Sequence, residues 1–202
     1  MERQPELVEG MFADPEKARA YGRRSAARNR RMGRTYAKEL ARVGYTGGPI
    51  LDAGCGSGEC SIELAKVFPD AEAVGLDLSP ELVEMAREKA AKSGPLPNLR
   101  FEVGDAAATP HPDGHFDVVI CTDVLQIVPD PVALVNELER VLAPGGRLYL
   151  GSIKRSWLGH LVPILKISFT IPEVREILQR TRLRPHEIIE KGIYFVVVAP
   201  PG

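Results

Sequence analysis

A glycine-rich turn between an apolar run and a helical pattern constrains this chain of 202 residues more than any other feature. The turn is Gly54-Cys55-Gly56-Ser57-Gly58, and it connects an apolar run from Pro49 with residues 59–68, whose apolar positions have helical spacing. This pattern predicts a buried strand, a tight turn and a helix. Glycines let a ligand approach the backbone closely, and a helix start offers unpaired N–H groups. The turn therefore predicts a ligand site.

The spacing of the glycines bears on which ligand binds there. Dinucleotide-binding folds place glycines at the first, third and sixth positions, which here are Gly54, Gly56 and Glu59. Glu59 would set negative charge where a pyrophosphate binds, and Asp52 adds a carboxylate at the end of the strand. Two acids favour a ligand that carries an amine or a sulfonium group. The spacing thus disfavours a nicotinamide-dependent oxidoreductase.

The composition sets limits on the class of protein. The chain is 44% hydrophobic with a formal net charge of -1, which fits one α/β domain and gives no general argument for nucleic acid. Its three cysteines form no Cys-x-x-Cys pair, so we expect reduced thiols in the cytoplasm. The acidic, polar N-terminus differs from a signal peptide, and no apolar stretch reaches the roughly 18 residues that span a bilayer.

Strand and helix patterns alternate after the glycine turn. Helices are expected to begin at Ser79 and Asp130 and to cover 170–180, and strands are expected at 73–76, 99–103, 116–121, 147–150, 187–189 and 194–198. Strands separated by helices predict a parallel sheet with right-handed crossovers. The chain is therefore expected to form an α/β fold.

Acidic residues follow three successive strands of this predicted sheet. They are Asp52, Asp77 and Asp105, and Cys121 ends the next strand. In open parallel sheets the ligand lies beyond the carboxyl ends of the strands, so we expect these residues to lie close together. Asp77 follows Asp52 by 25 residues, a separation that places an acid on a pair of ribose hydroxyls.

These motifs together resemble those of class I S-adenosylmethionine-dependent methyltransferases, in particular the small-molecule members of the domain 11 and 25 types. Residues 52–58 resemble the first motif, 75–79 the second, 104–106 the third and 116–130 the fourth. The resemblance covers the chain from residue 50 to its end. It implies a Rossmann-like, seven-stranded, mostly parallel sheet with helices on both faces and an antiparallel last strand. It also implies S-adenosylmethionine as the cofactor.

The resemblance also implies a set of cofactor-binding residues, with Asp77 on the ribose hydroxyls, Asp105 beside the adenine and an N-terminal tyrosine closing over the cofactor. The set is Asp52, Gly54, Gly56, Asp77, Leu78, Asp105, Ala106, Cys121 and Tyr21. Methyl transfer from a sulfonium depends mostly on alignment and desolvation, although an oxygen or carbon acceptor needs a base. The candidates for such a base are Asp123, His160, Tyr36 and Lys154. The sequence does not choose among them, so no catalytic residue is assigned.

Departures from the family's motifs bear on the acceptor. Residues 125–127 read Leu-Gln-Ile where many small-molecule members have a histidine pair, and the Asp-Pro-Pro-Tyr or Asn-Pro-Pro-Tyr motif used on nucleobase amines is absent. His111 and His115 are separated by a Pro-Asp-Gly turn, so no metal site is expected. We expect a small, apolar or aromatic acceptor. The alternatives are an RNA methyltransferase that uses the N-terminal arginines and a non-catalytic S-adenosylmethionine-binding protein; the oligomeric state stays open.

The chain is expected to divide into two parts. Residues 1–48 form a helical cap, with a helix over 17–43 that is interrupted near Gly22 and Gly33. Residues 49–202 form the methyltransferase domain, with a lid-like insert near 153–170 over the acceptor site. The insert is mostly apolar, and a buried connection at the sheet edge is the alternative interpretation.

The N-terminal arginines generate the first prediction. The segment holds Arg19, Arg23, Arg24, Arg28, Arg30, Arg31 and Arg34 with Tyr21 as its one interleaved aromatic residue, so we favour a solvated helix face over an RNA-binding patch. We expect no specific RNA binding in a filter-binding series at increasing salt. Submicromolar affinity with a steep salt dependence would contradict this prediction and favour the RNA alternative.

Overall fold

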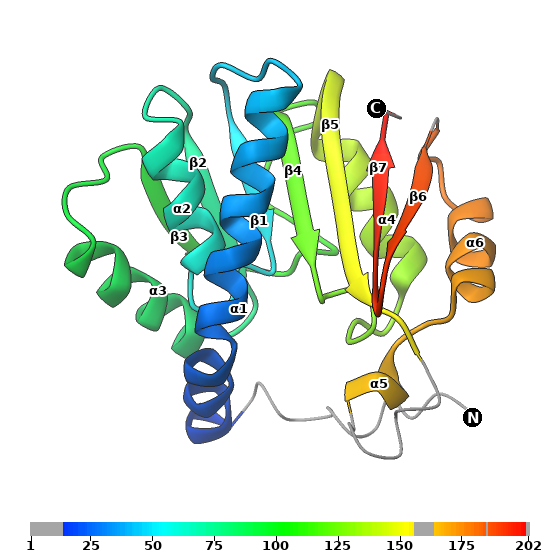
Figure 1. Cartoon of the computed structure of the whole chain (residues 1–202), viewed down its shortest axis with the longest axis horizontal. Helices are drawn as coiled ribbons and strands as arrows, with labels where there is room; N and C mark the ends of the chain where they lie inside the picture. Colours follow the sequence, from blue (N-terminus) through cyan, green and yellow to red (C-terminus); the bar gives the residue numbers. More distant parts are fainter. Residues whose placement is uncertain (1–13, 156–163, 185, 201–202) are drawn as a thin grey trace.

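One seven-stranded sheet forms the centre of the structure, a computed structural model that describes residues 14–155, 164–184 and 186–200 (Figure 1). The strands are β1 (Ile50–Ala53), β2 (Ala73–Asp77), β3 (Leu99–Val103), β4 (Phe116–Thr122), β5 (Leu142–Ile153), β6 (Glu187–Lys191) and β7 (Tyr194–Ala199). Their order is β3-β2-β1-β4-β5-β7-β6. β7 runs antiparallel to β5 and β6, whereas the pairs among β1 to β5 are parallel. The predicted fold class is confirmed.

Helices cover both faces of the sheet (Figure 1). They are α1 (Pro15–Arg42), α2 (Glu59–Val67), α3 (Pro80–Lys92), α4 (Pro131–Val141), α5 (Ile164–Ile167) and α6 (Ile171–Gln179). α1 and α2 pack on the face that carries Ile50 and Ile120, and α4 and α6 pack on the face that carries Leu51 and Val119. Because strand residues alternate between the two faces, the near-continuous apolar run of β4 fills both halves of the core.

The predicted helix starts are confirmed in detail. Ser79 and Asp130 cap α3 and α4 as predicted, and Asp14 caps α1 in the same way; each accepts one or two hydrogen bonds from backbone N–H groups of the first turn. A proline follows each cap directly, where its missing N–H costs the helix no internal hydrogen bond.

The region around β5 differs from the prediction. β5 begins at Leu142 rather than at residue 147, because Leu142 already pairs with Phe116 ahead of a register shift in the β4–β5 ladder. Residues 156–163 of the predicted lid-like insert lie outside the described residues. In the described remainder, the short helix α5 was not predicted, and Leu165 and Ile167 are buried.

α1 is one continuous helix, and the predicted interruptions at Gly22 and Gly33 are wrong. Both glycines are instead points of close contact with neighbouring helices. A Cβ atom on Gly33 would lie 2.8 Å from Cα of Cys60 in α2, and one on Gly22 would lie 3.0 Å from the terminal methyl of Met85 in α3. The absence of side chains at these two positions lets α1 lie directly on α2 and α3 (Figure 1).

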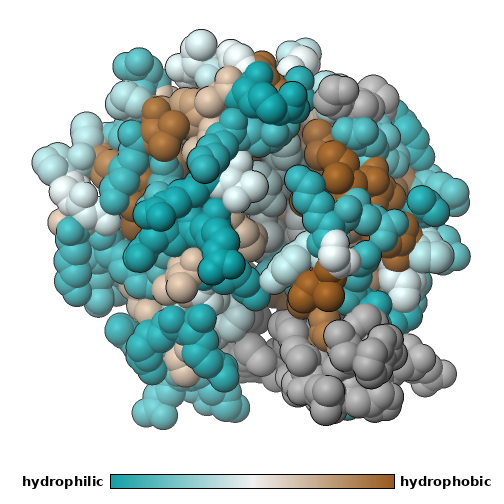
Figure 2. Space-filling model, viewed as in Figure 1, coloured by the Kyte–Doolittle hydropathy of each residue, from teal (hydrophilic) through white to brown (hydrophobic). Residues whose placement is uncertain are grey.

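Ion pairs also hold α1, and its outer face is basic. Arg19 pairs with Glu81 of α3, and Arg34 pairs with Glu63 of α2 at 2.8 Å. Hydrophilic residues follow the line of α1 in Figure 2. The exposed arginines of α1 are Arg23, Arg24, Arg30, Arg31, Arg34 and Arg42. Across the described part of the chain, no helix combines the length and the apolar character needed to cross a membrane.

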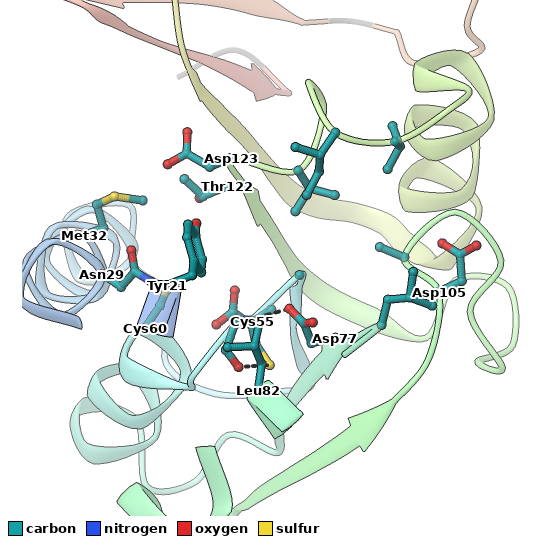
Figure 3. A pocket seen from close by; sticks show the side chains of 18 of the residues that line it. Tyr21, Asn29, Met32, Cys55, Cys60, Asp77, Leu82, Asp105, Thr122 and Asp123 are labelled. Carbon is teal, nitrogen blue, oxygen red and sulfur yellow. Dashed lines mark hydrogen bonds between the residues drawn. The ribbon is translucent and has the colours of Figure 1, made fainter. Parts of the chain in front are cut away.

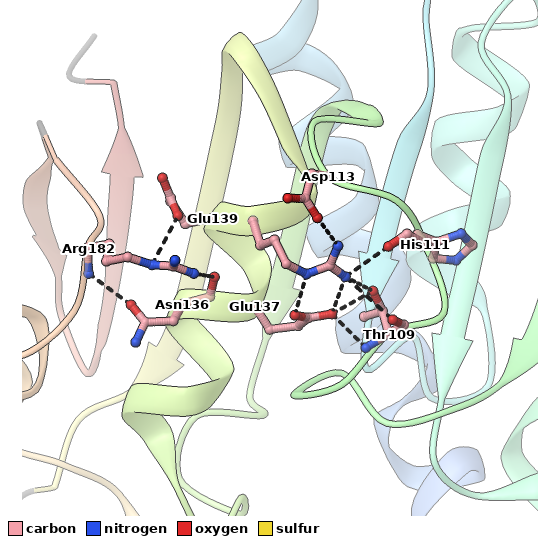
Figure 4. Close-up of polar contacts among 8 residues, drawn as sticks. Thr109, His111, Asp113, Asn136, Glu137, Glu139 and Arg182 are labelled. Carbon is pink, nitrogen blue, oxygen red and sulfur yellow. Dashed lines mark hydrogen bonds and ion pairs between the residues drawn. The ribbon is translucent and has the colours of Figure 1, made fainter.

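A polar network fixes the segment between β3 and β4 onto α4 (Figure 4). Glu137 accepts hydrogen bonds from the backbone N–H and the hydroxyl of Thr109, at 2.7 and 2.9 Å. Arg140 donates to Glu137, to Asp113 and to the backbone oxygen of His111. The segment that follows Asp105 and Ala106 is therefore anchored by α4.

The close contact at Gly33 generates a stability prediction. In an exposed helix position Gly→Ala stabilises by about 1 kcal/mol, but at Gly33 the added methyl group meets the backbone of Cys60. We expect Gly33→Ala to lower the free energy of unfolding by about 1–3 kcal/mol, as overpacking of a buried contact does, measured by urea denaturation. Thr35→Ala on the exposed face of α1 is the control and should stay within about 0.5 kcal/mol. A stabilised Gly33→Ala protein would show that α1 does not depend on this contact.

Candidate functional site

A cavity of about 300 Å³ opens at the carboxyl ends of β1, β2 and β4, beside α1. Most of its lining comes from α1, the end of β1 with the glycine turn after it, the ends of β2 and β3, and the loop after β4, and α2 and α3 contribute one residue each. The described acids of the lining are Asp52, Asp77, Asp105 and Asp123, and one arginine, Arg28, lies among them. Carboxylates thus dominate the charge of the cavity.

The structure brings eight of the nine predicted cofactor-binding residues together in this lining. They are Asp52, Gly54, Gly56, Asp77, Leu78, Asp105, Ala106 and Tyr21. Cys121 lies outside the lining and is completely buried in the core on the α4 face, and its neighbour Thr122 lines the cavity instead. The reason is the alternation of side chains along β4, which extends to Thr122. Thr122 points to the face of the sheet that carries α1, so Cys121 points to the opposite face. The roles of all nine residues remain predictions.

The glycine turn folds over the end of β2. Gly54 has a φ of 79°, and a Cβ atom there would lie 2.1 Å from a methyl group of Val124, so only glycine fits. The backbone N–H groups of Gly54 and Cys55 both donate to the oxygen of Leu76, at 2.7 and 2.9 Å. The turn is therefore tied to the strand that carries Asp77.

Asp77 is held by two backbone N–H groups. Its Oδ2 atom accepts from Gly56 at 2.8 Å, and its Oδ1 atom accepts from Ser79 at 2.9 Å. Burial raises the pKa of Asp77, while the two backbone hydrogen bonds act in the opposite direction. Each oxygen keeps acceptor capacity, so the fixed carboxylate suits a pair of adjacent hydroxyls. Figure 3 shows Asp77 beside Cys55 in the lining.

Asp52 lies deeper in the site and is anchored to α2. Its side chain is buried and accepts a hydrogen bond from the hydroxyl of Ser61 at 2.5 Å. Burial raises the pKa of Asp52 to about 6, against the effect of the Ser61 hydrogen bond. A cation bound in the cavity would favour the charged form of this carboxylate.

Glu59 does not act as its sequence position suggests. Its buried carboxylate accepts from Ser57 at 2.9 Å and pairs with Lys89 of α3, and it is not part of the cavity lining. The expectation that Glu59 places negative charge beside the ligand is therefore wrong. Its charge is neutralised within the interface between α2 and α3.

α1 contributes one face to the cavity. Tyr21 extends into it between Asp77 and Asp123 (Figure 3), and burial raises the pKa of its hydroxyl. The other lining residues of α1 are Arg28, Asn29 and Met32, which the sequence analysis did not identify as site residues. The separation of Tyr21, Arg28 and Met32 by seven and then four residues marks one helix face, and this spacing is the signal that could have found them.

The loop after β4 brings one of the four candidate bases into the cavity. Asp123 lines it, and its carboxylate lies 3.3 Å from the guanidinium of Arg28. Tyr36 lies in the core and shares a hydrogen bond with Thr122 at 3.0 Å, and Lys154 pairs with Glu190 at 2.8 Å. His160 lies outside the described residues. Of the candidate bases in the described part of the chain, Asp123 therefore lines the cavity, whereas Tyr36 and Lys154 do not.

Metal ligands were not expected from the sequence. Within the described ranges, no group of three or more His, Cys, Asp or Glu side chains is arranged to hold a metal ion. His111 instead contacts Glu102 at 3.2 Å and packs edge-on against Phe116.

Comparison with known proteins finds a family model described as "Methyltransferase domain", which matches residues 46–180. Ubiquinone biosynthesis O-methyltransferase of Xanthomonas oryzae pv. oryzae (strain PXO99A) is 38% identical over 117 residues, which are 57% of this chain and 47% of the relative. The protein of the same name from Xanthomonas euvesicatoria pv. vesicatoria (strain 85-10) is 36% identical over 115 residues, which are again 57% of this chain and 47% of the relative. The chain spans about half the length of these curated relatives.

Two solved structures share nearly the whole fold. A putative S-adenosyl-L-methionine-dependent methyltransferase from Methanococcus maripaludis superposes with a TM-score of 0.77 at 21% identity, covering 92% of each chain. A SAM-dependent methyltransferase from Aquifex aeolicus superposes with a TM-score of 0.75 at 25% identity, covering 92% of this chain and 97% of that one.

The position of Asp77 generates a binding prediction. If its carboxylate holds two ribose hydroxyls, Asp77→Ala removes hydrogen bonds to a charged group, which are worth about 1.5–3 kcal/mol. We expect the dissociation constant of S-adenosylhomocysteine, measured by calorimetry, to rise about 10- to 150-fold.

Two further variants separate a lost contact from a disturbed turn. Asp77→Asn keeps one acceptor oxygen for the backbone and should also weaken binding, while Asp70→Ala removes an exposed acid ahead of β2, far from its carboxyl end, and should not. An unchanged dissociation constant in a folded Asp77→Ala protein would remove Asp77 from the site.

Proposed function

The chain belongs to the methyltransferase-domain family, and from this premise we propose that it transfers a methyl group from S-adenosylmethionine to a small apolar or aromatic acceptor. The observation that carries the proposal is the acid-lined cavity at the carboxyl ends of β1, β2 and β4. In open α/β sheets this edge is where ligands bind.

The end of β2 fits the nucleoside part of such a cofactor. Asp77 offers a carboxylate fixed by two backbone N–H groups to the ribose hydroxyls. Leu78 follows it and is 68% exposed although it is a large apolar residue in the lining, and Ala106 lies in the same lining. An exposed apolar side chain in a concave site suits contact with an aromatic base. Asp105 is the neighbouring acceptor for the exocyclic amine of the adenine.

The charge of the cavity fits the remainder of the cofactor. An amino acid sulfonium carries an ammonium group and a positive sulfur, and the described lining holds Asp52, Asp77 and Asp105 besides the Asp123–Arg28 ion pair. Burial keeps the pKa of Asp52 near 6, so a bound cation would stabilise its ionised form. S-adenosylhomocysteine lacks the sulfonium charge, so the same acids hold the cofactor more strongly than the product.

The acceptor occupies the part of the cavity that α1 and the loop after β4 enclose. Met32, Val124, Ile127 and Val128 supply apolar surface there, at about 25 cal/mol for each Å² of apolar area removed from water. The curated relatives are named O-methyltransferases, and this supports an oxygen as the methylated atom. The arginines of α1 favour an RNA acceptor less, since Arg19, Arg28 and Arg34 are paired with carboxylates.

When bound, S-adenosylmethionine supplies an electrophilic methyl group on a positively charged sulfur. The residues of the chain bind and orient the reactants and exclude water from them. Asp77 and the glycine turn fix the nucleoside end, and Tyr21 extends into the cavity and takes up space that water would otherwise fill. Alignment and desolvation of this kind are the main contributions a protein makes to transfer from a sulfonium.

A thermal-shift experiment tests the cofactor assignment. A ligand at 100 times its dissociation constant stabilises the folded state by about 2.7 kcal/mol, which corresponds to a rise in Tm of about 5–10 °C for a chain of this size. We expect S-adenosylhomocysteine to produce this rise and NAD to leave Tm unchanged. A shift with NAD alone would contradict the proposal. Transfer of radiolabelled methyl groups to a panel of phenols then tests the reaction.

A further inference from the structure

Asp123 adopts a backbone conformation that is uncommon for residues other than glycine. Its φ is 58°, and it has the only positive φ among the described residues other than glycine. The backbone N–H of Asp123 donates to the oxygen of Gly151 at 2.9 Å, which fixes the turn after β4. Residues held in the left-handed region cluster at functional sites, because the surrounding structure has to supply the cost of the conformation.

The carboxylate of Asp123 is buried, oriented and directed at the cavity. Its side chain is only 9% exposed, and it accepts a hydrogen bond from the backbone N–H of Ile153 at 3.3 Å. Arg28 lies 3.3 Å from its Oδ2 atom, so both carboxylate oxygens have a protein partner while the residue lines the cavity. Burial raises the pKa of Asp123, and the charge of Arg28 opposes this effect.

The pairing with Arg28 decides which acceptor group suits Asp123. The arginine compensates the carboxylate charge, so the site offers little net attraction for an ammonium group and fits a neutral hydrogen-bond donor. A carboxylate accepts a proton efficiently only from a group whose pKa is not far above its own. A phenolic hydroxyl, with a pKa near 10, meets this condition better than an aliphatic hydroxyl does.

Asp123 also lies across the cavity from Asp77, with Tyr21 between them (Figure 3). The nucleoside end of the cofactor and this acid therefore occupy different ends of the site. On these grounds, and resting on the proposed function, we infer that Asp123 is a catalytic residue that takes the proton from a phenolic hydroxyl of the acceptor.

The step balances without a further reactant. The acceptor oxygen forms a bond to the methyl carbon while the carbon–sulfur bond breaks, and the electron pair of that bond stays on sulfur. The hydroxyl proton moves to a carboxylate oxygen of Asp123. Among the described residues, the titratable and charged groups that interact electrostatically with Asp123 are Tyr21, Arg28 and Tyr36 of α1 and the buried Cys121 of β4.

The test compares two phenols of different acidity on the purified full chain. At mildly alkaline pH, 4-methylphenol is still protonated and needs a base, whereas 4-nitrophenol is largely ionised and does not. We expect Asp123→Asn, which tolerates a positive φ, to lower kcat/KM for 4-methylphenol by about 10²–10⁴-fold. The loss for 4-nitrophenol should stay below about tenfold, because its oxygen is already deprotonated.

Two controls separate chemistry from folding and from cofactor binding. Glu63→Gln breaks the Arg34 ion pair between α1 and α2 away from the cavity and should leave both rates unchanged. The dissociation constant of S-adenosylhomocysteine should be the same for wild type and Asp123→Asn. Failure of wild type to bind S-adenosylhomocysteine would contradict the proposed function, whereas equal losses on both phenols would overturn only the role of Asp123.

A spectroscopic titration gives a readout that does not depend on turnover. In the complex with S-adenosylhomocysteine, the yellow phenolate form of bound 4-nitrophenol reports the charge beside its oxygen. Removing a neighbouring carboxylate should lower the apparent pKa of the bound phenol by about one unit or more in Asp123→Asn. The same titration midpoint in both proteins, or wild type that binds S-adenosylhomocysteine but methylates neither phenol, would overturn the inference.

Discussion

The hydrogen bond from the backbone N–H of Gly56 to the carboxylate of Asp77 connects the ends of β1 and β2, and the candidate site depends on it. It gives the glycine turn its position, since the N–H of Gly54 is bound to Leu76 in the same strand. It also helps to hold a carboxylate of the cavity lining in one orientation. The side chain of Asp77 after β2 and the backbone N–H of Gly56 after β1 thus hold each other in position. This arrangement depends on the parallel pairing of β1 with β2.

Local patterns predicted a parallel sheet, helix starts and acids at the strand ends, whereas the seven-stranded topology with its antiparallel last strand came from the family resemblance. Asp52, Asp77 and Asp105 follow apolar runs, and parallel strands bring their carboxyl ends to one edge whatever the side chains of the helices are. Cys121 shows the limit of this reasoning. β4 extends one residue beyond the predicted strand, and one residue is enough to exchange the face of the sheet to which a side chain points.

Residues whose placement depends on contacts between distant segments were not predicted. Gly22 and Gly33 suggested interruptions of α1 because glycine weakens isolated helices, but the contacts with α2 and α3 outweigh that preference. Arg28 and Met32 reach the cavity only because α1 crosses the strand ends. Glu59 was placed beside the ligand by spacing alone, whereas its pairing with Lys89 of α3 turns it into a packing residue. The pattern of a single sequence predicts where the helices form but not how they pack against one another.

The left-handed backbone of Asp123 has a consequence for how a protein of this kind diverges. Only a few residue types tolerate a φ of 58°, chiefly glycine, asparagine and aspartate, and among these aspartate is the one that carries a charge. Substitutions of Asp123 that avoid backbone strain, to asparagine or glycine, therefore remove the carboxylate altogether. New specificities are expected to arise through neighbours with ordinary backbones, such as Ile127 and Met32, which vary in size without strain. The backbone conformation thus distinguishes Ile127 and Met32, where side-chain size can change in small steps, from Asp123, where one substitution removes the charge.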